Sequence, residues 1–216
     1  MGTAVSAARE EILRRVRRGL EDVPASERPE DVTVVRGYLE SEPEAGLERF
    51  VERVADYGSA VQVVGVGGIV EALSAACRDL DVSSLVVPTD LPAEWAPSGV
   101  ELIPDTGLDV RELDRIGAAL TGSALGIAET GTVVLDGGPG QGRRALSLVP
   151  DVHLCVIDET QVVDGVPAAF RQLGAAARAR RPLTFVSGPS ATSDIELARV
   201  EGVHGPRRFG LVVVRH

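Results

Sequence analysis

Four loop segments carry residue types that could bind or transform a small molecule. The first, GIAETGTVV, interrupts an apolar run with Glu129 and continues with Thr130, Gly131 and Thr132. A carboxylate beside buried strands is costly to desolvate unless it is hydrogen-bonded, paired or exposed in a cleft. In a cleft, Glu129 could act as a general acid, a general base or a nucleophile. The structural alternative is an acid that stabilises a turn by accepting bonds from nearby N–H groups.

The second segment, LDGGPGQGRR, is a glycine-rich loop that ends in Arg143 and Arg144. A guanidinium group presents a planar fork of donors to a carboxylate or a phosphate. The pair is therefore predicted to clamp an anionic ligand. A plain mobile surface loop would have the same composition.

The third segment, SGPSATSDIELARVEGVHGP, spans residues 187–206. Ser193 and Glu196 have the spacing of a capping box, which predicts a short helix that ends near Gly202. The first turn of such a helix offers N–H groups to an anion. His204 lies in the following turn, where it could be a base or a substrate contact, or could be bonded within its own turn. The predicted ligand-binding residues of this segment are Ser190, Thr192, Ser193 and Asp194.

The fourth segment, VQVVGVGGIVEAL, has the pattern of a strand, a glycine-rich turn and a helix. The backbone N–H groups of Gly65, Gly67 and Gly68 could cradle the phosphate of a cofactor. The glycine spacing does not complete a dinucleotide fingerprint. Tight packing of the strand against the helix would require the same glycines.

A layered α/β sheet is expected to position these loops. From residue 60 onward, short β-branched runs alternate with helical segments. The expected strands are 60–65, 84–88, 100–104, 123–128, 132–136, 152–158, 183–188 and 208–216, and the expected helices are 69–80, 108–120 and 164–180. Strands this apolar are typically buried on both faces, so the pattern predicts a three-layer sandwich around a mostly parallel sheet. Ligands of such sheets bind beyond the carboxyl ends of the strands.

A helical arm and a second helix precede this sheet. Residues 6–20 predict an amphipathic helix with Ser6 as its N-cap and a basic end, RRVRR, that could be solvated or could dock an acidic partner. Residues 21–37 resemble an irregular connector. Ser41 and Glu44 have capping-box spacing before the next helix. Its expected buried stripe is Leu47, Phe50, Val51, Val54 and Tyr57. We therefore expect an arm over 1–40 and an α/β domain over 41–216.

Composition excludes several classes of protein. The chain has 216 residues and a formal charge of -10, which repels nucleic acid and anionic lipid. Cys77 and Cys155 lie in apolar runs without metal-ligand spacing, so neither a disulfide, a metal site nor an iron–sulfur cluster is expected in this chain. No signal peptide or membrane span is apparent, which predicts a soluble cytoplasmic protein.

Three motifs resemble the LUD domain family, in its lactate utilisation C branch. They are GIAETGTVVL, SLVPDVHLCVI and SGPSATSDIELARVEGVHGP, in this order, and they cover the C-terminal half. Ala191 stands where the family often has a basic or amide residue. The resemblance implies an α/β sandwich similar to the NagB/RpiA/CoA-transferase group. It also implies a role in oxidising L-lactate to pyruvate with sister proteins that carry iron–sulfur clusters, this chain being the cluster-free member.

Two other functions remain open on the sequence. One is a stand-alone enzyme of the same fold group, in which Glu129 acts on an acyl-CoA, a sugar phosphate or a folate. The other is an interaction module, in which the Arg-rich N-terminal helix binds an acidic partner. The resemblance favours a cluster-free subunit or accessory protein that binds a small carboxylate or another anion, a partner protein, or both.

Overall fold

The computed structural model describes residues 2–24, 26–31, 33, 35, 37, 46–192, 200–201 and 205–216. The chain divides into two compact units, Met1–Tyr38 and Leu39–His216, and each is described by itself. The first unit holds α1 (Gly2–Gly19) and a 3-10 turn, η1 (Pro29–Asp31). Helix α1 begins before Ser6, so the prediction that this residue caps the helix is wrong.

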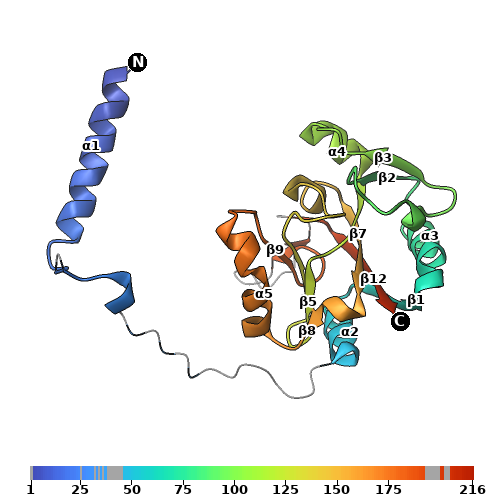
Figure 1. Cartoon of the computed structure of the whole chain (residues 1–216). Coiled ribbons are helices and arrows are strands. Elements are labelled where there is room, and N and C mark those ends of the chain that lie inside the picture. Colours follow the sequence, from blue (N-terminus) through green and yellow to red (C-terminus); the bar gives the residue numbers. More distant parts are fainter. Residues whose placement is uncertain are drawn as a thin grey trace. The chain divides into compact units, whose positions relative to one another are not determined.

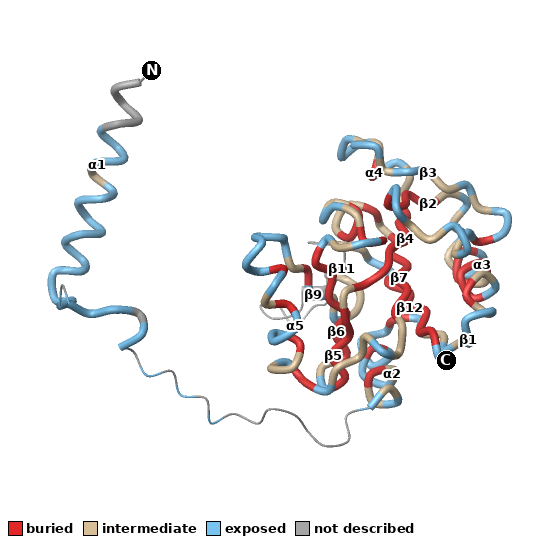
Figure 2. The backbone as a smooth tube through the Cα atoms, in the orientation of Figure 1, coloured by how far each residue is buried: buried red, intermediate tan, exposed pale blue. Residues whose placement is uncertain are grey.

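One side of α1 carries Ile12, Leu13 and Val16, and Leu20 follows directly after the helix. We call these four residues the α1 stripe. Its side chains are 61%, 37%, 51% and 56% exposed, in that order. Figure 2 shows α1 in the colour of exposed residues over most of its described length. The predicted amphipathic face is therefore present in this helix, but it faces solvent.

The second unit is built on a six-stranded sheet, sheet A, whose strand order is β1-β12-β7-β4-β2-β3. Every neighbouring pair in it is parallel. In sequence order the strands are β1 (Ala60–Gly65), β2 (Ser84–Val87), β3 (Glu101–Pro104), β4 (Ala118–Thr121), β7 (Val152–Asp158) and β12 (Arg208–Arg215). The central strands are buried, as the red segments of Figure 2 show. The α/β class and the mostly parallel sheet are confirmed.

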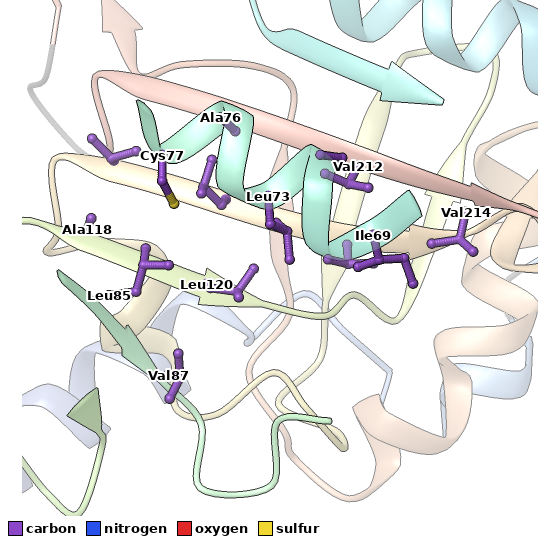
Figure 3. Close-up of a cluster of buried hydrophobic side chains, with 14 residues drawn as sticks. Ile69, Leu73, Ala76, Cys77, Leu85, Val87, Ala118, Leu120, Val212 and Val214 are labelled. Atoms are coloured by element: carbon purple, nitrogen blue, oxygen red, sulfur yellow. The ribbon is translucent and has the colours of Figure 1, made fainter. Parts of the chain in front are cut away.

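Helix α3 (Ile69–Asp79) covers one face of sheet A. Figure 3 shows Leu73 and Cys77 of this helix directed at the sheet, in one buried cluster with Leu120 and Val212. The helix follows β1 directly, through the 3-10 turn η2 (Val66–Gly68). Its apolar face thus anchors the edge strand to the centre of the sheet.

The opposite face is covered by α2 (Leu47–Asp56) and by a second sheet, sheet B (Figure 1). Sheet B has the order β8-β5-β6-β9, and α5 (Val166–Arg178) packs on its outer face. Its strands are β5 (Leu125–Ile127), β6 (Thr132–Leu135), β8 (Val162–Val163) and β9 (Thr184–Val186). Phe50 and Val54 of α2 are fully buried, as expected, whereas Tyr57 is 44% exposed. The capping residues predicted at 41–44 lie outside the described residues.

The helix expected over 108–120 is shorter than predicted. Helix α4 (Val110–Ile116) starts with a capping box between Asp109 and Glu112 and ends at Gly117, whose φ is 75°. Glycine tolerates this left-handed conformation, which stops the helix. The next four residues form β4, which is fully buried between β7 and β2. An apolar run of this length has no periodicity that separates a helix end from a buried strand.

Cys77 and Cys155 are free thiols, as expected, and lie on opposite faces of sheet A. Burial raises the pKa of Cys77 to about 11 and that of Cys155 to about 12. Both thiols therefore pack as small apolar groups. Within the described residues, no helix combines the length and the apolar character needed to cross a membrane.

Candidate functional site

A cavity of about 180 Å³ lies between the loop after β9 and the segment that leads into β7. We call it the hydroxyl pocket, because the residues around it include four with side-chain hydroxyl groups. The lining residues are Ser147, Leu148, Thr184, Phe185, Val186, Ser187, Gly188, Ser190, Gly205 and Pro206. One water needs roughly 10–15 Å³, and drug-sized ligands occupy roughly 300–1,000 Å³. The pocket is therefore sized for a small polar molecule.

The pairing of β6 with β9 brings two of the predicted segments together. Val133 pairs with Val186, so the residues on either side, Thr132 and Ser187, meet at the end of the two strands. Their hydroxyl oxygens are 2.8 Å apart, and the hydroxyl of Thr132 is 2.7 Å from that of Thr130. The ETGT turn is thus connected to the pocket by a chain of three hydroxyl groups.

The β5–β6 turn is pressed against the end of α2. Gly131 has a φ of 59°, and a Cβ atom added there would lie 2.6 Å from the main chain of Arg53. Only glycine fits both the left-handed conformation and this approach. Gly131 therefore has a structural reason for its place in the motif, and it fixes Thr130 and Thr132 on either side of the turn.

Glu129 lies on the same turn, with its side chain exposed. Its backbone N–H donates to the carbonyl of Asp164 at 2.9 Å, and the residue does not line the hydroxyl pocket. The expectation of a carboxylate enclosed in a cleft does not match this placement. The hairpin turn carries the carboxylate into solvent, so no desolvation cost arises. A catalytic role for Glu129 remains a prediction.

Arg143 and Arg144 line a smaller recess of about 10 Å³ that shares Ser147 and Thr184 with the hydroxyl pocket. The Nε and Nη2 atoms of Arg143 donate to the carboxylate of Asp105 at 2.6 and 3.0 Å. This pair lowers the pKa of Asp105 and raises that of Arg143. The Nη2 atom also bonds to the carbonyl of Leu108. Arg143 is therefore occupied in holding the loop after β3.

The Arg144 side chain is exposed, and no ion pair or hydrogen bond of its guanidinium occurs with the described residues. It belongs to the short 3-10 helix η4 (Arg144–Ser147), which presents Arg144 and Ser147 to the same recess. Of the two arginines that were predicted to clamp an anion, Arg144 is thus the one whose guanidinium is available to bind it.

The glycine-rich loop before the arginines is held by side chains. The backbone N–H of Asp136 donates to Oε1 of Gln141 at 2.7 Å, and Nε2 of Gln141 donates to Asp136 at 3.1 Å. Arg181 adds an ion pair to the same carboxylate at 2.8 Å. The loop is consequently not the plain surface loop that its composition allows.

Gly65, Gly67 and Gly68 lie at the carboxyl end of β1, where Gly65 pairs with Arg215 at the end of β12. The hydroxyl pocket lies near the opposite end, because Gly205 and Pro206 immediately precede β12. A Cβ atom at Gly68 would meet Cβ of Val64 at 3.0 Å, as expected for tight strand–helix packing. The glycine turn and the pocket are therefore not brought together.

Part of the SGPS segment lies outside the described residues, including Ser193, Asp194 and His204. Ser190 is described and donates its backbone N–H to the carbonyl of Pro206 at 2.8 Å. Thr192 belongs to β10 (Ala191–Thr192), which pairs antiparallel with β11 (Val200–Glu201). The predicted helix does not include 200–201, because strand pairing takes its place there.

Sequence reasoning missed Ser147, Thr184 and Ser187 as pocket residues. A signal was available for two of them, since Ser187 begins the SGPS motif and Ser147 begins the SLVP motif. Thr184 carries no motif. It is found only from its position at the start of β9, opposite Leu135 of β6.

A buried polar cluster lies on sheet A and does not line the pocket. Nε2 of His153 is 2.8 Å from the hydroxyl of Thr121, while the Nδ1 atom has no partner in the described part of the chain. Complete burial lowers the pKa of His153 to about 4. The imidazole is therefore neutral in the folded protein at neutral pH.

The side chains around the pocket are suited to binding a small molecule. Hydroxyl groups both donate and accept hydrogen bonds, and the adjoining recess adds the guanidinium of Arg144. A small molecule with a carboxylate and a hydroxyl or carbonyl group would match this combination.

Comparisons with known proteins agree with this picture. Residues 105–214 match the model of the LUD domain. A relative in Deinococcus radiodurans, "Lactate utilization protein C", is 48% identical over 173 residues, which cover 78% of this chain and 79% of the relative. A protein of the same name in Halalkalibacterium halodurans is 38% identical over 109 residues, or 49% of this chain and 47% of that protein.

A solved structure has the same fold. It is the crystal structure of a DUF162 family protein from Deinococcus radiodurans, with a TM-score of 0.68 and 38% sequence identity. The similarity covers 78% of this chain and 96% of that one.

Proposed function

The chain belongs to the LUD domain family, and from this membership we propose that it serves lactate utilisation as a subunit that binds the small carboxylate. The observation that carries the proposal is the hydroxyl pocket beside Arg144. Its hydroxyl groups can bond to the hydroxyl of L-lactate or the carbonyl of pyruvate, and the guanidinium can bind the carboxylate. The names of the relatives support lactate as the substrate.

The proposal assigns the electrons to partner proteins. Oxidation of L-lactate to pyruvate removes two electrons and two protons from the C–H and O–H groups of the hydroxyl-bearing carbon. In the proposed system, iron–sulfur partners accept the electrons, and this chain contributes ligand binding. No cofactor is assigned to this chain.

Ligand binding is tested directly by titrating the purified protein with L-lactate and with pyruvate in a calorimeter. Ser187→Ala removes one pocket hydroxyl, and one lost hydrogen bond costs about 0.5–1.5 kcal/mol. We therefore expect the dissociation constant to rise about 2- to 13-fold. Ser83→Ala is the matched control, because Ser83 is exposed and does not line the pocket.

Inorganic phosphate and D-lactate serve as further titrants. Equal binding of phosphate and L-lactate would replace the hydroxy-acid proposal with a general anion site. Absence of heat with L-lactate and with pyruvate would overturn ligand binding by this chain.

Participation in the oxidation is tested by reconstitution. The iron–sulfur proteins of the system are assayed for lactate-dependent electron transfer with and without this chain, and we expect the rate to depend on it. The same assay examines Glu129→Gln, which we expect to be neutral because the carboxylate is exposed outside the pocket. A large loss of rate in Glu129→Gln would instead support the stand-alone enzyme.

A further inference from the structure

The α1 stripe has the exposure and the spacing of an unpartnered interface. Ile12, Leu13 and Val16 lie on one side of the 18-residue helix, Leu20 continues the stripe just after its end, and all four are at least 37% exposed. An isolated helix of this length is only marginally stable in water, and most helical stability comes from packing of an apolar face. A second surface against the stripe would therefore stabilise α1.

The charges beside the stripe indicate what that surface is. Glu10 precedes Leu13 by three residues and Arg17 follows it by four, so both flank Leu13 on the same side of the helix. Neither forms an ion pair with another described residue. A helix with an acid before and a base after the same apolar residue can pair with an identical helix that runs in the opposite direction, because each acid then lies near a base.

Three charged side chains on the opposite side of α1 already form ion pairs within the helix. Glu11 accepts bonds from Arg14 at 2.6 and 2.8 Å and from Arg15 at 2.8 Å. These bonds lower the pKa of Glu11. Glu11, Arg14 and Arg15 are thus already paired within the helix, whereas Glu10 and Arg17, which lie beside the stripe, are not paired with a described residue.

We propose that α1 is a dimerisation helix that pairs antiparallel with α1 of a second copy of this chain. A two-fold axis at Leu13 places this residue against the partner's Leu13. The same axis brings Glu10 to within one residue, about 1.5 Å along the helix, of the level of the partner's Arg17, and Arg17 equally close to the level of the partner's Glu10. Val16 then packs near the partner's Ile12, so the stripe is covered along its central part.

Charge favours this arrangement over the alternatives. A parallel pair would bring the two basic ends, with Arg17 and Arg18, alongside each other. The antiparallel pair separates these ends and opposes the helix dipoles favourably. An acidic partner would meet Glu10 with a like charge. Arg9 lies in line with the stripe, and its aliphatic stem can pack there while its guanidinium reaches the carboxyl end of the partner helix.

The expected dimer is weak. Eighteen residues make a helix about 27 Å long, so the contact is small beside the roughly 1,200–2,000 Å² buried in stable complexes. Sedimentation velocity of the full-length protein over a concentration series tests the proposal. The mass is expected to rise from 22.6 kDa toward twice that value as concentration increases.

Leu13→Glu places two carboxylates face to face at the axis and is expected to keep the protein monomeric throughout the series. Glu10→Arg and Arg17→Glu each turn two attractive pairs into two repulsive ones, which weakens dimerisation about 4- to 30-fold. The double variant Glu10→Arg/Arg17→Glu is expected to restore it. Arg18→Glu makes the same charge change on the opposite face and is expected to dimerise like the wild type.

Circular dichroism of every variant controls for loss of folding. A mass of 22.6 kDa at all concentrations overturns the proposal, as does a dimer that persists in Leu13→Glu. Failure of the double charge swap to rescue overturns the antiparallel register. If the wild type stays monomeric but co-sediments with phosphatidylglycerol vesicles, the stripe binds a lipid surface and the dimer is excluded.

Discussion

Arg143 and Arg144 are neighbours in sequence with different surroundings. Arg143 is bonded to Asp105, whose side chain is 5% exposed, whereas Arg144 points its guanidinium to solvent beside the recess. We expect Arg143→Ala to lower the free energy of unfolding by about 1–2 kcal/mol, because half-buried Asp105 then loses the guanidinium and keeps only the backbone N–H groups of Gly107 and Leu108. Arg144→Ala is expected to leave stability unchanged and to weaken binding of L-lactate. Urea unfolding and calorimetry of the two variants separate these roles, and equal stabilities would contradict the assignment.

His153 predicts a pH dependence of stability. Its pKa is about 4 in the folded protein and 6.5 when unperturbed, so the unfolded chain binds more protons between these values. The contribution of His153 is complete above pH 6.5 and decreases by about 3 kcal/mol as the pH falls toward 4. The contribution of His216 to stability has the opposite pH dependence. Its hydrogen bond with Asp158 raises its pKa, so this contribution is lost as the pH rises.

Urea unfolding at pH 5 and pH 7 measures this effect. His153→Gln removes the titrating group, and we expect the difference in unfolding free energy between the two pH values to shrink. An unchanged difference would show that the carboxylates account for the acid sensitivity.

The β5–β6 turn is the element that connects the pocket to α2. In Gly131→Ala the added Cβ meets the main chain of Arg53, and the left-handed conformation becomes strained. We expect a loss of more than about 1 kcal/mol in unfolding free energy and weaker binding of L-lactate, since Thr132 is displaced from Ser187. Gly67→Ala is the control, because nothing lies within 4 Å of its added Cβ. Thermal unfolding and calorimetry distinguish the two, and a stable, fully binding Gly131→Ala would contradict this role.

Periodicity predicted most elements because their apolar runs are long enough to have one pattern. It failed at β4, where four buried residues follow a helix and only the conformation of Gly117 separates the two elements. It also failed to divide the strands between two sheets, since pairing partners are set by packing rather than by local sequence. Of the residues that line the pocket, only Ser190 was among the predicted ligand-binding residues, and the ETGT motif reaches the pocket through the hydroxyl contact of Thr132 with Ser187. Thr184 could not be found, because its role follows from the register of β9 with β6.

At the scale of the whole molecule, the division of the chain into two compact units predicts that the α/β unit is stable without the N-terminal unit. Met1–Tyr38 and Leu39–His216 are separate compact units, so deletion of residues 1–38 should leave the unfolding of the α/β unit intact. At low concentration, where the proposed dimer is dissociated, we expect the same unfolding midpoint in calorimetry for both forms. A lower midpoint after deletion would show that the N-terminal unit stabilises the α/β unit.

The burial of both native thiols makes the protein suitable for site-specific labelling. Cys77 and Cys155 are the only cysteines in the sequence, and their raised pKa values leave almost no thiolate to attack a maleimide. A single cysteine introduced at exposed Arg18 would then take up a fluorophore or spin label against a negligible background. Energy transfer between donor- and acceptor-labelled copies could then follow an encounter of two molecules in real time.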